Sequence, residues 1–278
     1  MICAMPDLAG LRTHLEGLGR VLLGYSGGVD SALLGVLGAH TLGPDRFLAV
    51  IGISPSYPEA QLQVARDLAL RFAMPVLELE THELDDPRYA ANPTSRCYFC
   101  KTELWSQLRE VAEARGFQTI IDGTNLDDLG DHRPGLRAAE EREVVSPLVD
   151  LAWTKSDVRA AARELGIPIW NAPGQPCLAS RIRFGLEVTA ERLAQVERAE
   201  EYLRTLGVTG DLRVRHHGGT ARIEVETHHH AALEGRWDAL VVEFTTLGFK
   251  QVELDMAGYR RGSLLVLEAA PERAGVAS

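Results

Sequence analysis

A short glycine-rich turn contains the first residues of this sequence that suggest chemistry. The stretch SGGVDS, residues 26–31, lies between an apolar run and an expected helix. Backbone N–H groups at the start of a helix attract anions, and Gly27 and Gly28 let a ligand come close to the backbone. The hydroxyls of Ser26 and Ser31 can donate hydrogen bonds. We therefore expect this turn to bind phosphate.

Asp30 is the residue of this turn that a phosphate would repel. A carboxylate at that position is better suited to a Mg²⁺ ion that bridges phosphates. The turn is not a Walker A loop, because no Gly-Lys-Ser/Thr ends it, and it lacks the Gly-x-Gly-x-x-Gly of dinucleotide-binding folds. A tight strand-to-helix turn without a ligand is the alternative that this motif alone leaves open.

A second polar stretch, IDGTNLDD at 121–128, comes at the end of an expected strand. Ligands of open α/β sheets bind at the carboxyl ends of the strands, where the glycine turn also lies. The stretch offers oxygen atoms to a metal or a ribose, and the candidates are Asp122, Thr124, Asn125, Asp127 and Asp128. A loop that only caps a helix is the other explanation.

Three of the four cysteines stand in patterns that suggest chemistry. Cys97 and Cys100 are one helical turn apart, so their thiols share a face and can chelate one metal. A zinc site, a redox dithiol and two incidental thiols are the alternatives. Cys177 follows a proline, and the nearby Arg181 would favour its thiolate. A small buried apolar side chain is the ordinary role of a single cysteine.

Arg213 and Arg215 alternate on an expected strand, so both side chains face one side. Guanidinium groups suit a phosphate or carboxylates. Glu224, on the next expected strand, is a candidate for the same site. A solvated strand face is the alternative for the two arginines.

The elements that must position these residues alternate in the first two thirds of the chain. Apolar strands are expected at 20–25, 46–53, 75–80, 117–122 and 143–148, with helices at 31–42, 58–72, 96–115 and 154–165. This order predicts a doubly wound parallel α/β sheet. Later segments predict a helix at 189–207, a hairpin around 217–220, a helix near 229–247 and a strand at 249–254. We therefore expect a large domain over 1–185 and a smaller α+β domain over 186–278.

Composition limits the class of protein. The 278 residues carry 29 Lys and Arg against 39 Asp and Glu, a formal net charge of −10. That balance argues against a dedicated nucleic-acid binder, although it leaves room for a local basic patch. No apolar run approaches the roughly 18–20 residues of a transmembrane helix, and no signal-peptide pattern is present. We expect a cytoplasmic protein with neither a membrane nor a nucleic acid as partner.

The two polar stretches together resemble the PP-loop ATP pyrophosphatase superfamily over about residues 18–180. The resemblance implies cleavage of ATP between the α- and β-phosphates, adenylylation of a substrate oxygen and release of pyrophosphate. It implies magnesium at Asp30 and Asp127. It also implies an adenine contact at the end of the second strand, and ATP contacts from Ser26, Gly27, Gly28, Val29, Ser31, Ile53, Gly123, Thr124 and Asn125.

Four further stretches resemble the LarE-type sulfur transferases within that superfamily. They are NPTSRCYFCK at 92–101, DHRPGLRAA at 131–139, PCLASRI at 176–182 and GYRRGSL at 258–264. The resemblance implies that carboxylates of pyridinium-3,5-biscarboxylic acid mononucleotide become thiocarboxylates, for the nickel-pincer nucleotide cofactor of lactate racemase. Cys177 stands at the sulfur-donor position, beside Arg181. A hexamer, built as a trimer of dimers, is the implied assembly.

The resemblance leaves two sources of sulfur. Some LarE-type proteins have only the sacrificial cysteine, which ends as dehydroalanine. Others carry a Cys-x-x-Cys, and three cysteines then hold a [4Fe–4S] cluster with one iron open to an extra sulfide. The pattern here favours a cluster on Cys97, Cys100 and Cys177. A tRNA-thiolating PP-loop enzyme and a non-catalytic adenine-nucleotide sensor are the competing functions.

Overall fold

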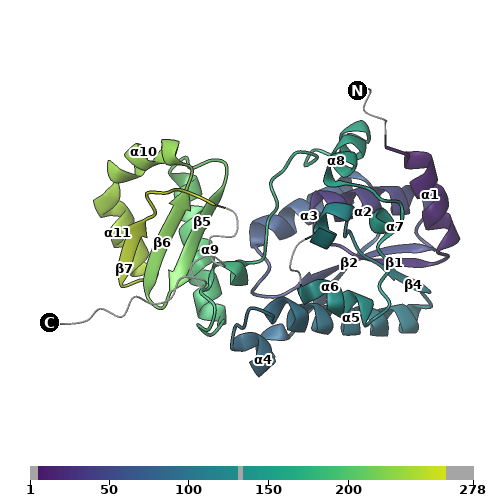
Figure 1. Ribbon diagram of the computed structural model, residues 1–278, viewed down its shortest axis with the longest axis horizontal. Coiled ribbons are helices and arrows are strands. Elements are labelled where there is room, and N and C mark those ends of the chain that lie inside the picture. Colours follow the sequence, from purple (N-terminus) through teal and green to yellow (C-terminus); the bar gives the residue numbers. More distant parts are fainter. Residues whose placement is uncertain (1–5, 131–133, 261–278) are drawn as a thin grey trace. The chain divides into compact units, whose positions relative to one another are not determined.

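The computed structural model describes residues 6–130 and 134–260 (Figure 1). The chain divides into two compact units, and we treat each by itself. Unit 1 contains the described residues of Met1–Ala90 and Thr94–Cys177, and unit 2 those of Ala91–Pro93 and Leu178–Ser278. The sequence places the domain limit later, after residue 185. The segment after Cys177 belongs to unit 2 because Leu178 and Ile182 are buried there and Ile182 bridges to His216.

A four-stranded parallel sheet forms the centre of unit 1, as predicted. Its order is β3-β2-β1-β4, with β1 Val21–Gly24, β2 Phe47–Ile53, β3 Val76–Glu80 and β4 Thr119–Ile121. β1 and most of β2 are buried on both faces, which explains their continuous apolar runs. The fifth strand predicted at 143–148 is wrong except for one bridge between Ile121 and Val145. Pro147 begins α7 there, and proline cannot donate to a strand ladder.

Helices cover both faces of this sheet (Figure 1). They are α1 Leu8–Gly17, α2 Val29–Leu42, α3 Glu59–Arg71, α4 Pro87–Ala90, α5 Arg96–Arg115, α6 Pro134–Glu140, α7 Pro147–Asp150 and α8 Lys155–Glu164. One apolar cluster joins α1, α2, α3 and α8 to the sheet, and a second joins α5 and α6 to its other face. α1 was not predicted. Through residues 6–130 and 134–260, no helix has the length and apolar character needed to span a membrane.

The longest helix, α5, lies closely against the sheet because of a glycine. Gly24 ends β1, and a Cβ at that position would lie 2.6 Å from the ring of Trp105. Trp105 is 2% exposed. The strand that leads into SGGVDS and the helix that carries the two cysteines therefore share one contact.

Unit 2 is a small α+β unit, as predicted. Its sheet has the order β5-β6-β7, with β5 Leu212–His217, β6 Thr220–Val225 and β7 Gln251–Leu254. β5 and β6 form the predicted hairpin, closed by Gly218 and Gly219, both at positive φ. Its helices are α9 Ala190–Thr205, α10 His230–Glu234 and α11 Trp237–Thr246. The helix predicted near 229–247 is thus two helices, because α10 ends at Gly235 and α11 begins after Arg236.

One face of the β5–β6 hairpin packs into the apolar core of unit 2, and His216 lies on that face. Its ring is 5.2 Å from the ring of Phe249, and its Nε2 is 3.0 Å from Oε1 of Gln195. Burial, followed by the charge of Arg192, lowers the pKa of His216 from 6.5 to about 4. The neutral ring is therefore part of the folded core.

Lowering the pH should destabilise unit 2 through His216. Its pKa is lower in the folded than in the unfolded chain, so its stabilising contribution is complete above pH 6.5 and is lost as the pH falls toward 4. His216→Gln should reduce the loss of unfolding free energy between pH 6.5 and 4 by at most about 3 kcal/mol. Urea unfolding from pH 4 to 7 measures the effect, with the exposed His228→Gln as control. Parallel profiles for His216→Gln and the parent chain would contradict this assignment.

Candidate active site

The glycine turn has a backbone that only glycine supports. Gly27 has φ 65°, and a Cβ there would lie 2.8 Å from Cβ of Ala65 and 2.9 Å from Nε2 of Gln61. The carbonyl of Ser26 accepts hydrogen bonds from Tyr57 Oη at 2.9 Å and Gln61 Nε2 at 3.1 Å. These two side chains, one just before α3 and one on it, hold the turn in place.

α2 begins at Val29, earlier than predicted, with Gly28 as its N-cap and no side chain capping it. The hydroxyls of Ser26 and Ser31 are 3.1 Å apart, and Ser31 donates to the Gly28 carbonyl at 3.1 Å. Two hydroxyls and the positive end of a helix dipole therefore gather at one point. That arrangement suits an anion such as a phosphate.

Asp30, on the first turn of α2, has two partners that come from distant segments. Its Oδ1 accepts from Nδ2 of Asn125 at 3.1 Å, and its Oδ2 is 2.5 Å from Nζ of Lys155. Gly123 allows the loop after β4 to come this close, because a Cβ there would lie 2.9 Å from the backbone nitrogen of Ser31. The structure thus brings Asp30, Gly123 and Asn125 together, as the sequence predicted, and adds Lys155.

Sequence reasoning missed Lys155. The available signal was its place directly after Thr154, which caps α8 through the predicted capping box with Asp157. The start of α8 is hydrogen-bonded to Asp127 of the loop after β4, which lies at the carboxyl edge of the sheet. A lysine there is a candidate partner for phosphate or for Asp30.

Two aspartates of the loop after β4 hold the loop itself in place through hydrogen bonds. Asp122 accepts from the N–H and hydroxyl of Thr124, at 3.0 and 2.7 Å, and from the Ser146 hydroxyl at 2.8 Å. Asp127 accepts the backbone N–H of Lys155 at 2.8 Å and so caps α8. Asp127 therefore connects the loop to α8 in this arrangement.

Asp30 passes a simple test for a magnesium ligand. Its carboxylate, 19% exposed, already holds the ammonium of Lys155, so the site accepts a cation. One carboxylate oxygen of Asp127, the other predicted magnesium ligand, already accepts a hydrogen bond from the α8 backbone. Among the residues that the structure describes, no three His, Cys, Asp or Glu side chains are arranged to hold a metal ion.

The end of β2 carries a second group that the sequence did not single out. The carbonyl of Ile53, the predicted adenine contact, accepts the N–H of Thr81 at 2.8 Å. Glu83, 3% exposed, accepts from the hydroxyls of Ser54 at 2.5 Å and Thr81 at 2.8 Å. This carboxylate joins the carboxyl ends of β2 and β3, beside the predicted adenine position.

The three described cysteines of unit 1 form no disulfide with one another, and Cys177 affects the pKa of the other two. Cys97 is an exposed residue on the first turn of α5, and Cys100 and Cys177 are half-buried. Desolvation of its sulfur by the surrounding protein raises the pKa of Cys97, and the charge of Cys177 raises it further. Burial raises the pKa of Cys100, with added effects from Glu83 and Cys177. The thiols lie within electrostatic reach of one another, yet as arranged they form no metal-binding group.

The predicted substrate residues lie together in unit 2. Arg213 and Arg215 are each 6% exposed, so the alternative of a solvated strand face is wrong. Arg213 pairs with Glu224 across the hairpin, which puts both side chains on one face. Arg215 donates from Nε to Glu224 and from Nη1 to the Ser180 carbonyl, both at 2.9 Å.

Arg181 lies in the same charged layer of unit 2. It donates from Nε and Nη2 to the two carboxylate oxygens of Glu200, at 2.9 and 3.0 Å. Glu200 also accepts the N–H of Val214 on β5 at 3.0 Å. Burial and the charge of Arg181 lower the pKa of Arg213, whose guanidinium lies 5.3 Å from the ring centroid of Tyr259. The sequence offered no signal for Glu200, because its partners are distant along the chain.

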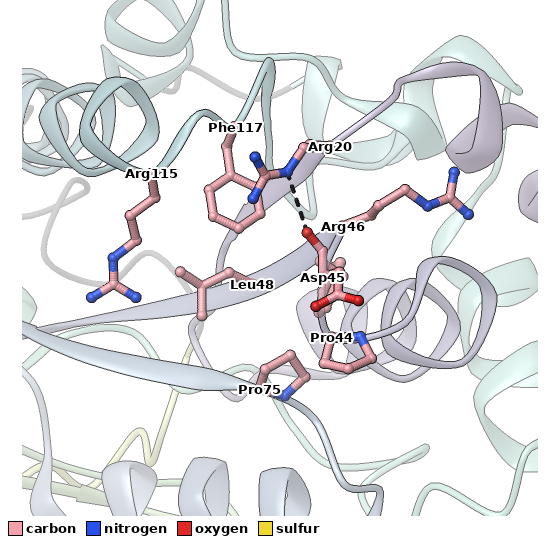
Figure 2. Close-up of a pocket in the computed structure, with 9 residues that line it drawn as sticks. Arg20, Pro44, Asp45, Arg46, Leu48, Pro75, Arg115 and Phe117 are labelled. Atoms are coloured by element: carbon pink, nitrogen blue, oxygen red, sulfur yellow. Dashed lines mark hydrogen bonds between the residues drawn. The ribbon is translucent and has the colours of Figure 1, made fainter.

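A hollow of about 630 Å³ lies at the opposite edge of the unit 1 sheet (Figure 2). Arg20 and Arg46 directly precede β1 and β2, and Arg115 ends α5. Arg20 donates to the Asp45 carbonyl at 3.2 Å and covers the ring of Phe117. Arg115 lies in the last turn of α5, so its charge offsets the negative end of that helix dipole. The hollow is separate from the glycine turn.

Gly27→Ala should weaken ATP binding by more than about tenfold. The new Cβ would clash with α3 and strain a positive φ at the point where phosphate is expected. Gly43→Ala is the matched control, because Gly43 has φ 71° but open space around its Cβ position. Calorimetric titration with ATP measures both variants. Equal affinities for the two variants would contradict phosphate binding at the glycine turn.

Comparison with known proteins places the chain. The NAD synthase family model matches residues 9–111. The chain is 42% identical over 259 residues to the uncharacterized protein slr1717 of Synechocystis sp., covering 92% of this chain and 96% of that protein. It is 33% identical to the uncharacterized protein MJ0830 of Methanocaldococcus jannaschii, over 87% of this chain and 91% of that protein.

A third relative has a named activity. The chain is 34% identical to pyridinium-3,5-bisthiocarboxylic acid mononucleotide synthase of Lactiplantibacillus plantarum, over 92% of each chain. The match includes both units, and the glycine turn, Asp30 and the loop after β4 meet as the resemblance implies. The chain belongs to the LarE-type family of PP-loop sulfur transferases.

Proposed function

We propose that this chain adenylylates the carboxylates of pyridinium-3,5-biscarboxylic acid mononucleotide and converts them to thiocarboxylates for the nickel-pincer nucleotide. The observation that carries the proposal is the meeting of Asp30, Asn125 and Lys155 at the uncapped start of α2. The name of the Lactiplantibacillus relative supports the choice of substrate.

In the first step a substrate carboxylate oxygen attacks the α-phosphorus of ATP, and pyrophosphate leaves. A carboxylate is a poor electrophile because its leaving group would be oxide, and AMP is a far better one. The helix start and the hydroxyls of Ser26 and Ser31 would hold the pyrophosphate. Asp30 would hold a magnesium ion, which when bound would offset the negative charge of the phosphates.

Lys155 has two roles in this proposal. Without nucleotide its ammonium pairs with Asp30, as the structure has it. With nucleotide it would turn to a phosphate oxygen and leave Asp30 to the metal. The lysine thereby keeps the carboxylate neutralised until the ligand arrives.

The charged layer of unit 2 would bind the substrate. Arg213 and Arg215 lie on one strand, and Glu224 holds Arg215 in one orientation. Glu200 does the same for Arg181 through two hydrogen bonds. Guanidinium groups that are already oriented lose little entropy when they bind a phosphate or carboxylate.

In the second step the Cys177 thiolate attacks the adenylate, and AMP leaves. β-Elimination at Cys177, in which the Cα proton is lost and the Cβ–S bond breaks, then releases the substrate as a thiocarboxylate and leaves dehydroalanine. The iron–sulfur cluster on Cys97, Cys100 and Cys177 stays a prediction. Three thiolates are the donor set that such clusters use, but the present arrangement forms no metal-binding group, so we derive no step through it.

Asp30→Ala should slow pyrophosphate release at least about 100-fold, because the residue that would hold the magnesium ion is removed. Asp45→Ala, at the opposite edge of the sheet, is the matched control. Release from ATP should require the pyridinium dicarboxylate. Release that requires tRNA instead would favour a tRNA-thiolating enzyme, and no release with either substrate would favour a nucleotide sensor.

The sulfur source should be visible by mass. If Cys177 is sacrificial, a single turnover should remove about 34 Da, the mass of H₂S, from the peptide that contains it. If a cluster supplies the sulfur, anaerobically purified protein should contain about four irons per chain. That protein should lose its iron on Cys→Ala at any of the three positions and should turn over repeatedly with added sulfide. A mass loss in iron-free protein would end the cluster hypothesis.

A further inference from the structure

We propose that Tyr98, held by α6, is the positioning residue of the cysteine pair. It would fix the first turn of α5 so that the thiols of Cys97 and Cys100 are directed toward Cys177. The chemical purpose of this arrangement rests on the proposed sulfur transfer. The arrangement itself is a property of unit 1 and can be tested without any turnover.

Tyr98 is part of a closed set of contacts with α6 and the residue after it. Its hydroxyl donates to Oε2 of Glu141 at 2.6 Å, and the guanidinium of Arg137 lies 4.4 Å from its ring centroid. Arg137 in turn pairs with Oε1 of Glu141 at 3.1 Å. Both ends of the tyrosine side chain are therefore held.

The backbone of α6 also approaches the cysteine turn closely. A Cβ at Gly135 would lie 3.1 Å from Cγ of Lys101 and 3.6 Å from the carbonyl oxygen of Cys97. The glycine lets α6 lie directly on the first turn of α5. The contact therefore includes the main chain of one of the two cysteines.

The other residue between the cysteines is held from α4. The guanidinium of Arg88 lies 5.0 Å from the ring centroid of Phe99, and the rings of Tyr98 and Phe99 meet edge to face at 5.5 Å. Side chains three positions apart share a helix face, whereas the two residues between them point elsewhere. Holding both intermediate residues therefore fixes the rotation of this turn and the direction of both thiols.

The thiols to be positioned are the three that already interact. The charge of Cys177, which belongs to the same unit, raises the pKa of both Cys97 and Cys100. Loss of one exposed cation–π contact should change the population of the positioned state about two- to fivefold. Loss of the tyrosine ring together with its hydroxyl should change this population more.

The test measures how readily two of these thiols are bridged. In a Cys3→Ser, Cys100→Ser background only Cys97 and Cys177 remain, and dibromobimane becomes fluorescent when it links two nearby thiols. Arg137→Gln should slow bridging two- to fivefold, and Arg137→Lys should restore most of the rate. Tyr98→Leu should slow it by more than about fivefold, with Tyr98→Phe in between. Mass analysis of the linked peptides confirms the pair.

Arg71→Gln is the matched control, because Arg71 lies 5.5 Å from the ring of Phe72 in a similar cation–π pair on α3. It should leave the bridging rate unchanged. Arg137 is 68% exposed, so its replacement keeps the fold, which a thermal unfolding midpoint verifies. Unchanged bridging in both Arg137→Gln and Tyr98→Leu would overturn the proposal, as would a background protein that does not bridge at all.

The same proteins separate this proposal from the proposed function. Pyrophosphate release by the parent chain depends on the glycine turn and on the correct substrate, not on bridging. If release fails while the tyrosine series behaves as expected, the substrate or reaction is wrong and the positioning stands. If release occurs and the series shows no effect, the reverse holds.

Discussion

The ion pair between Asp30 and Lys155 joins residues that are 125 positions apart. It ties the first turn of α2 to the first turn of α8, and Asn125 adds the loop after β4 to the same carboxylate. Both side chains are mostly shielded from water, so neither charge is well solvated without the other. Three separate segments must be in register for this contact to form. The geometry around the glycine turn therefore depends on the completed fold and not on the turn alone.

Unit 2 also contains buried charges, but there three arginines face two carboxylates. Arg181, Arg213 and Arg215 are all nearly buried, a costly state for guanidinium groups. Glu200 and Glu224 offset that cost through paired hydrogen bonds. Glu200 thus orients Arg181, and Glu224 orients Arg215.

Local patterns in the sequence predicted most of the fold. Continuous apolar runs predicted the parallel strands, Thr154 and Asp157 predicted the start of α8, and Gly218-Gly219 predicted the hairpin. Each of these signals acts within a few residues. The predicted strand at 143–148 failed because Pro147 starts a helix there, and the helix near 229–247 failed because the chain turns at Gly235.

The parts of the site that escaped prediction share one property. The partners that give these residues a structural role lie on other segments of the chain, as for Lys155, Glu83 and Glu200. A single sequence shows residue types but not these pairings. The glycine turn and the cysteine motif were recognisable because their residues are neighbours along the chain.

Trp105, which packs closely against Gly24, can serve as a fluorescent reporter of its surroundings. Its indole extends from α5 to the strand that leads into the glycine turn, and Nζ of Lys101 lies 5.0 Å from the ring centroid. Indole emission responds to the field and packing around the ring. A chain in which Trp105 is the sole tryptophan would thus carry its own optical reporter, which responds both to changes at the strand before the glycine turn and to changes at the cysteine turn.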